Sequence, residues 1–162
     1  IVGKREPIEA IRQNPLMRAL RCGKLTYAAL EATLKLFLNP DLLLETHPTL
    51  RMFTESVDVL TQRGNSILNS LSDLPGKGLV VRVGESVAQA GSGTLPLEEF
   101  ESVALVIASE NPSVTELARR LRQCEPAIVG YIKDDQLYLD LRTVDKDELG
   151  LLAAGIRSAL AG

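Results

Sequence analysis

The spacing of apolar residues changes near residue 78, and this change constrains the fold more than any other feature of the sequence. Up to about residue 71, apolar residues recur at helical intervals, as in Leu30, Leu34 and Leu38. From Leu79 onward they form short runs rich in β-branched residues, which are typical of strands. The sequence therefore predicts a helical first part followed by an α+β part.

The first part predicts several short helices. Residues 7–13 form one candidate, and Asn14-Pro15 then predicts an N-cap followed by proline at the first position of a helix that Gly23 ends. Thr26 is expected to cap a further helix that runs to Leu38. Residues 49–71 predict a long helix with one apolar stripe.

The second part predicts the order helix-β-β-α-β-β-α. Strands are expected at residues 79–83, 103–108, 128–132 and 137–141. Ser113 and Glu116 fit a capping box, and Asp145 is expected to cap the last helix. These elements indicate an α+β domain, with a mostly antiparallel sheet covered on one face by helices.

Composition excludes several classes of function. Cys22 and Cys124 lie far apart, which argues against a disulfide framework or zinc site and favours a reducing cytoplasm. His47 is the only histidine and precedes Pro48 at an expected helix start, so we predict no metal site. No apolar run is long enough to span a membrane, and we expect no secretory signal. The net charge of −3 argues against nucleic-acid binding over the whole surface.

The charge is nevertheless uneven, because residues 1–24 hold six basic and two acidic side chains. Arg18 and Arg21 are three residues apart on a predicted helix, so both guanidinium groups are expected on one face. Two such groups suit a phosphate or a similar oxyanion, and Lys24 would add charge one turn later. The alternative interpretation is a solvated helix face.

Two further patterns suggest sites. Gly91, Ser92, Gly93 and Thr94 form a small-residue segment that would let backbone N–H groups approach an anion, with a plain hairpin connection as the alternative. Asp140 and Arg142, two residues apart on a predicted strand, are expected on the same face as a structural ion pair.

Three segments, in the same order, carry a family resemblance. They are PLMRALRCGKLTYAALEATL (residues 15–34), GSGTLP (residues 91–96) and PAIVGYIKDDQLYLDLR (residues 126–142). Together they resemble the C-terminal portion of the bacterial L-seryl-tRNA(Sec) selenium transferases, or selenocysteine synthases. The chain departs from the family pattern at Cys22, Gly23 and Tyr131.

The resemblance implies the aspartate-aminotransferase-like fold of type I pyridoxal-phosphate enzymes. Residues 1–45 would then be the end of the large cofactor domain with its connecting helices, and residues 46–162 the small C-terminal α+β domain. The family converts L-seryl-tRNA(Sec) to L-selenocysteinyl-tRNA(Sec) with selenophosphate, and is expected to be cytoplasmic and homo-oligomeric, as a decamer. The start of the chain is expected to be the end of a buried strand, which indicates a fragment.

The resemblance also implies roles for individual residues. Arg18 and Arg21 match the motif arginines that bind the selenium donor, with Lys24 beside them. The segment from Gly91 to Thr94 is expected to border the active site. The lysine that holds pyridoxal phosphate is expected upstream of Ile1, so the chain alone is predicted to be inactive.

Two other functions remain open. One is a related pyridoxal-phosphate lyase that acts on a phosphorylated amino compound, which Arg18 and Arg21 would suit equally well. The other is a non-catalytic oligomerisation or tRNA-contacting module, with the helix predicted at residues 49–71 as an assembly surface.

Overall fold

A computed structural model describes residues 2–74, 78–90 and 95–161 of the chain. The chain divides into two units, residues 1–50 and residues 51–162. Within the described ranges, no helix is both long and apolar enough to cross a membrane.

The first unit is a series of short helices without a core of its own. Its elements are α1 (Arg5–Gln13), the 3₁₀ helix η1 (Pro15–Arg18), α2 (Lys24–Leu36), the 3₁₀ helix η2 (Pro40–Leu42) and α3 (Leu43–Thr46), and α4 (Pro48–Thr54) begins in it. None of residues 2–50 is buried. Leu25 and Leu38, for example, are 87% and 82% exposed.

Some of the helices and caps predicted for this unit are confirmed, and others are wrong. The helix at residues 7–13 is confirmed as α1. The Asn14 cap is also confirmed, because its side-chain oxygen accepts a hydrogen bond from the Leu16 N–H at 2.9 Å. The Thr26 cap is wrong: α2 begins two residues earlier, with Gly23 at the N-cap position and no side-chain cap.

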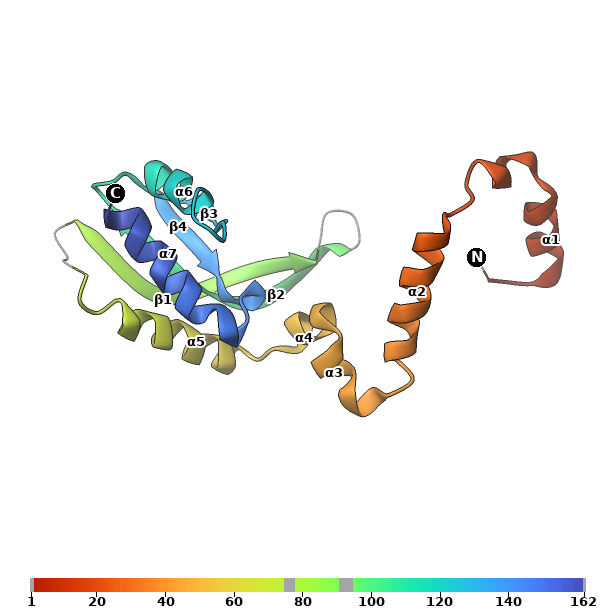
Figure 1. Ribbon diagram of the computed structural model, residues 1–162, viewed down its shortest axis with the longest axis horizontal. Coiled ribbons are helices and arrows are strands. Elements are labelled where there is room, and N and C mark those ends of the chain that lie inside the picture. Colours follow the sequence, from red (N-terminus) through yellow and green to blue (C-terminus); the bar gives the residue numbers. More distant parts are fainter. Residues whose placement is uncertain (1, 75–77, 91–94, 162) are drawn as a thin grey trace. The chain divides into compact units, whose positions relative to one another are not determined.

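The second unit is an α+β domain built on a four-stranded sheet (Figure 1). Its elements are α5 (Val57–Ser70), β1 (Leu79–Ala90), β2 (Leu95–Ser109), α6 (Val114–Arg122), β3 (Tyr131–Lys133), β4 (Gln136–Asp140), the 3₁₀ helices η3 (Leu141–Thr143) and η4 (Lys146–Glu148), and α7 (Leu149–Ala161). The strand order is β1-β2-β4-β3, and every pair is antiparallel. The predicted element order and antiparallel sheet are confirmed.

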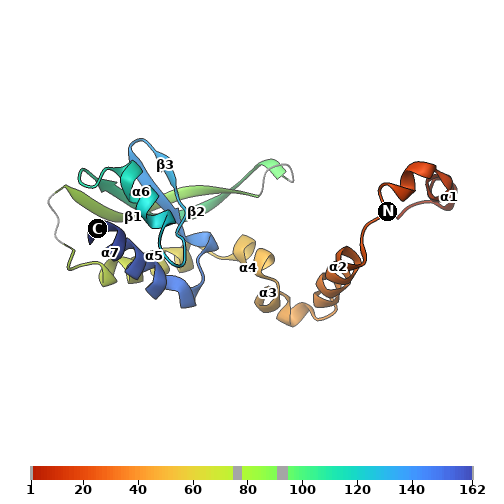
Figure 2. The ribbon, with the colours of Figure 1, turned by 45° about the horizontal axis from the view of Figure 1, so that its top comes forward.

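Helices cover one face of this sheet, and strand alternation shows which face. Val103, Leu105 and Ile107 of β2 belong to the buried core cluster, and successive strand residues point to opposite faces. The same cluster contains residues of α5, α6 and α7, including Leu60 and Ile156. All three helices therefore pack on the same face, as Figures 1 and 2 show from two directions. The opposite face carries no helix among the described residues of this unit.

The long helix predicted at residues 49–71 is wrong, because the chain forms α4 and α5 with a break at Glu55-Ser56. Ser56 is the N-cap of α5, and its hydroxyl accepts from the Val59 N–H at 3.4 Å. A serine that satisfies a free N–H group favours a new helix start over continuation of the old helix. The continuous apolar stripe concealed this break.

The remaining caps are mostly as predicted. Asp145 and Glu148 form a capping box at the start of η4, which runs directly into α7. The Ser113 hydroxyl accepts from the Glu116 N–H at 3.3 Å, which confirms half of the other predicted box. The Glu116 carboxylate instead accepts from Arg119 and Arg120, one turn further along α6.

Candidate functional site

The candidate anion-binding segment lies in the first unit, between η1 and α2. Arg18 is the last residue of η1, Arg21 follows outside any helix, and Lys24 is the first residue of α2. All three side chains are exposed. The segment therefore presents three cations to its surroundings at the connection between two helices.

The prediction that Arg18 and Arg21 share a face of one helix is wrong. The 3₁₀ helix spans only Pro15–Arg18, so the helical spacing does not extend to Arg21. Gly23 then adopts an extended conformation before α2 begins. The two arginines are close in sequence but do not share a helical face.

The other predicted loop, Gly91, Ser92, Gly93 and Thr94, lies outside the residues that the structure describes. Its role stays a prediction.

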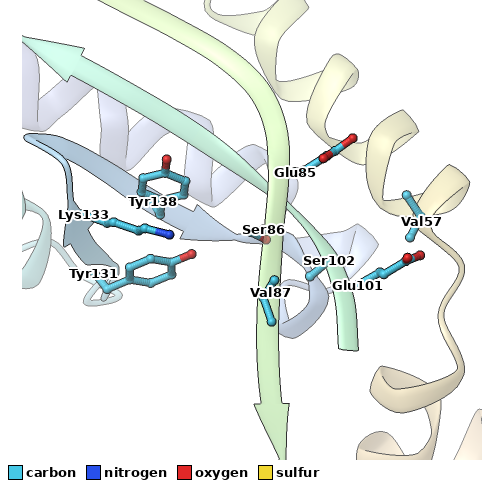
Figure 3. Close-up of a pocket in the computed structure, with 9 residues that line it drawn as sticks. All are labelled: Val57, Glu85, Ser86, Val87, Glu101, Ser102, Tyr131, Lys133 and Tyr138. Carbon is cyan, nitrogen blue, oxygen red and sulfur yellow. The ribbon is translucent and has the colours of Figure 1, made fainter. Parts of the chain in front are cut away.

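In the second unit, a hollow of about 500 Å³ adjoins strands β1 and β2 (Figure 3). It is lined by Val57, Glu85, Ser86, Val87, Glu101, Ser102, Tyr131, Lys133 and Tyr138. In Figure 3, Tyr131, Lys133 and Tyr138 lie on one side of β1, and Val57 and Glu101 lie on the other. The tyrosines and Lys133 belong to the side of the sheet that the helices leave open.

Asp140 organises the polar part of this open face. Its carboxylate accepts hydrogen bonds from the Ser86 hydroxyl at 2.7 Å and the Ser102 hydroxyl at 2.8 Å. It also accepts from the Arg142 N–H at 2.9 Å and so caps η3. One carboxylate thereby ties β1, β2 and the end of β4 together.

The predicted ion pair between Asp140 and Arg142 is wrong. The strand ends at Asp140, and Arg142 lies in η3, so the two side chains do not follow strand alternation. The Arg142 guanidinium donates instead to the carbonyl oxygens of Met52 at 2.8 Å, Glu55 at 3.0 Å and Glu101. Only 7% of Arg142 is exposed, and the Nε atom has no hydrogen-bond partner in the described part of the chain.

The aromatic pair on the open face is a feature that the sequence patterns did not single out. Tyr131 and Tyr138 are stacked, with ring centroids 5.1 Å apart and planes 11° apart. Burial raises the pKa of the Tyr131 phenol, and the nearby Asp140 charge and Tyr138 add to the effect. The Tyr131 hydroxyl therefore stays protonated at neutral pH and is available as a hydrogen-bond donor.

A hairpin signal could have found this pair. Asp134 and Asp135 have positive φ angles of 50° and 54°, as in a two-residue type I′ turn. Such a turn fixes the strand register, and it places Tyr131 opposite Tyr138. Ser86 and Ser102 reach Asp140 only through pairing between strands far apart in sequence, which no local pattern indicates.

A Schiff-base cofactor would need a lysine in an enclosed site. Lys4, Lys24, Lys35, Lys133 and Lys146 are all exposed. The described residues also include no group of three or more side chains that could hold a metal ion. The residues that the structure describes therefore do not form a complete pyridoxal-phosphate site.

The chain is similar to one family of known proteins over nearly its whole length. The family model described as "SelA: L-seryl-tRNA selenium transferase" matches residues 1–145. Curated relatives carrying the name L-seryl-tRNA(Sec) selenium transferase include proteins of Alkaliphilus metalliredigens, 36% identical over 158 residues, and Aquifex aeolicus, 39% identical over 161 residues. The matches cover 98% and 99% of this chain but only 34% and 35% of those relatives. The chain thus spans about a third of the length of the curated relatives it matches.

Proposed function

The chain belongs to the SelA family of L-seryl-tRNA selenium transferases, and from this premise we propose that it is the C-terminal part of an enzyme that makes L-selenocysteinyl-tRNA(Sec). The parent enzyme would use L-seryl-tRNA(Sec) and selenophosphate, and would be a cytoplasmic homo-oligomer. The observation that carries the proposal is the match over almost the whole chain, at 36% to 39% identity, to proteins of that name.

The proposed contribution of this chain to the reaction is to bind the selenium donor. Arg18 and Arg21 would hold the selenophosphate oxygens, and Lys24 would add charge at the same place. Guanidinium groups suit this task because each presents a planar fork of donors to an oxyanion. The exposure of all three side chains is consistent with a ligand that approaches from outside the unit.

The first unit would belong with the large cofactor domain of the parent enzyme. Its support is physical: residues 2–50 bury none of their side chains, although α2 carries Tyr27, Leu30 and Leu34 along one stripe. Apolar patches of this kind are usually covered in a folded protein. We therefore assign residues 1–45 to the end of the large domain and residues 46–162 to the small C-terminal domain.

SelA family members are pyridoxal-phosphate enzymes, and the cofactor supplies the electron sink for chemistry at the seryl group. The lysine that binds it is proposed to lie in the sequence upstream of Ile1. The residues of this chain would then bind and orient the donor and help to exclude water. On its own the chain is expected to be inactive.

A chimeric enzyme tests this function. The matching third of the Aquifex aeolicus relative would be replaced by this chain, and conversion of seryl-tRNA(Sec) to selenocysteinyl-tRNA(Sec) with selenophosphate would be measured. The proposal predicts conversion by the chimera and none by the chain alone. Cofactor absorbance of the chimera serves as the control for correct folding.

The same assay separates the proposal from a related lyase. A chimera that binds pyridoxal phosphate but does not transfer selenium, and that instead cleaves a phosphorylated amino compound, would contradict selenium transfer. Absence of both activities in a cofactor-loaded chimera would favour a non-catalytic module.

A further inference from the structure

The open face of the sheet combines aromatic rings, cations and small side chains in one place. The stacked rings of Tyr131 and Tyr138 stand on β3 and β4. Lys133 is exposed beside them and lines the same hollow (Figure 3). The proposed donor-binding residues Arg18, Arg21 and Lys24 belong to the first unit, and the residues of the open face belong to the second.

Arg82 of β1 adds a second cation to this face. Its guanidinium donates to the Gln136 side-chain oxygen of β4 at 3.1 Å, across the intervening strand β2. It also lies over Gly84, since a Cβ at that position would be only 2.5 Å from the Arg82 Nη1 atom. A side chain at Gly84 would therefore collide with the Arg82 guanidinium in its present position.

Small residues of the sheet line the space between the tyrosine rings and the two cations. Ser86 and Ser102 are paired across β1 and β2, and Ser102 is only 2% exposed. Both hydroxyls donate hydrogen bonds to Asp140, which fixes the orientation of the two serine side chains. The hollow is lined from both sides of β1, and its open-face lining consists of Ser86, Ser102, Tyr131, Lys133 and Tyr138.

We propose that this open face binds an unpaired nucleotide of RNA, with its base stacked against Tyr131 and Tyr138 and its phosphate beside Lys133 and Arg82. Stacking on aromatic side chains is the usual way in which proteins hold splayed-out RNA bases on an antiparallel sheet. Tyr131 lies on an edge strand and is 41% exposed, which leaves ring surface for a base. The choice of RNA rests on the proposed function, which makes a tRNA the substrate.

Charge sets the expected strength and extent of binding. Lys133 and Arg82 match one or two phosphates. The Asp140 carboxylate on the same face, and Glu85 and Glu101 on the other side of the strands, repel further ones. The site therefore fits a short unpaired segment rather than a long strand or a duplex. Because only two cations take part, affinity is expected to be weak and to fall with added salt.

The test is an NMR titration of the isotope-labelled 162-residue chain with a 5′-phosphorylated CCA ribotrinucleotide at low salt. The trinucleotide presents unpaired purine and pyrimidine bases, and inorganic phosphate is titrated in parallel. Saturable shifts of the Tyr131, Lys133 and Tyr138 amides, larger than those caused by phosphate, are expected. Replacing Tyr131→Leu should weaken trinucleotide binding roughly tenfold, and Lys133→Ala should reduce its salt dependence.

Two matched variants in exposed positions elsewhere, Tyr27→Leu and Lys146→Ala, should bind as the unchanged chain does. Unaltered β2 amide signals in each variant establish that the sheet is intact. The proposal is overturned if the trinucleotide moves no open-face signals, if phosphate alone reproduces the shifts, or if Tyr131→Leu binds normally. The titration needs no cofactor and no selenium donor, so its failure is distinguishable from failure of the selenium-transfer assay.

Discussion

Replacing Arg142 with methionine would remove the group that joins β2 to the junction between α4 and α5. The guanidinium donates to the carbonyl oxygens of Met52, Glu55 and Glu101, and only 7% of the residue is exposed. Methionine retains most of the aliphatic stem, so packing changes little. The variant therefore isolates the effect of the three hydrogen bonds.

The magnitude follows from the acceptors that are left behind. A buried carbonyl that loses its donor costs about 1 kcal/mol or more, so three carbonyls give about 3 kcal/mol. Relief of the desolvated Arg142 charge offsets part of this loss. We expect the free energy of unfolding to fall by roughly 2–3 kcal/mol, a large share of the ~5–15 kcal/mol that is typical of a domain.

Urea unfolding, followed by the NMR signals of β2 amides, measures this change. Arg122→Met is the matched control, because Arg122 is exposed on the same domain, and its urea midpoint should stay near that of the unchanged chain. If Arg142→Met unfolded at the same urea concentration as the control, the assignment of Arg142 as a structural clamp would be refuted.

Two further predictions concern packing and pH. Gly64→Ala would place a Cβ 2.9 Å from the Val83 Cγ2 atom, so overpacking of roughly 1–3 kcal/mol should outweigh the helix-propensity gain of about 1 kcal/mol. Gly150→Ala meets nothing within 4 Å, and thermal melts should place its Tm above that of Gly64→Ala; the reverse order would contradict the packing. Arg119, followed by Arg120, lowers the pKa of the Glu116 carboxyl from 4.5 to about 2. The ionised Glu116 carboxylate therefore stabilises the folded state fully above pH 4.5, and this contribution is lost as the pH falls through about 2. A ¹³C titration should show a higher Glu116 pKa in Arg119→Met, and an unchanged value would disprove the assigned cause.

Short-range signals predicted much of the second unit. The caps predicted at Asp145 and Ser113 and the order of strands and helices depend on residues within a few positions of one another, and all are present. The capping box predicted between Ser113 and Glu116 is only half formed. Strand β3 is shorter than expected, Tyr131–Lys133 instead of residues 128–132. Strands β1 and β2 are longer than expected, since they pair with each other well beyond their apolar runs. Pairing of backbone groups, rather than side-chain type, extends them.

Long-range contacts explain what the sequence did not predict. Asp140 and Arg142 are two residues apart, yet the Asp140 carboxylate binds serines on β1 and β2, and the guanidinium binds carbonyls up to 90 residues away. The break before α5 was missed because Ser56 interrupts the helix without interrupting the apolar stripe. Helical spacing does not place Arg18 and Arg21 on one face. The proposal that they bind the selenium donor therefore depends on their place in the family motif.

The dependence of selenium transfer on selenophosphate concentration tests the role of these arginines most directly. In the chimeric enzyme, Arg18→Gln and Arg21→Gln would each be compared with Arg5→Gln, an exposed arginine of α1. Loss of charge-assisted hydrogen bonds to an oxyanion costs about 1.5–3 kcal/mol, so KM for selenophosphate should rise roughly ten- to hundredfold in the first two variants. The Arg5→Gln enzyme should keep its KM. Unchanged KM values in Arg18→Gln and Arg21→Gln would contradict a donor site in this chain.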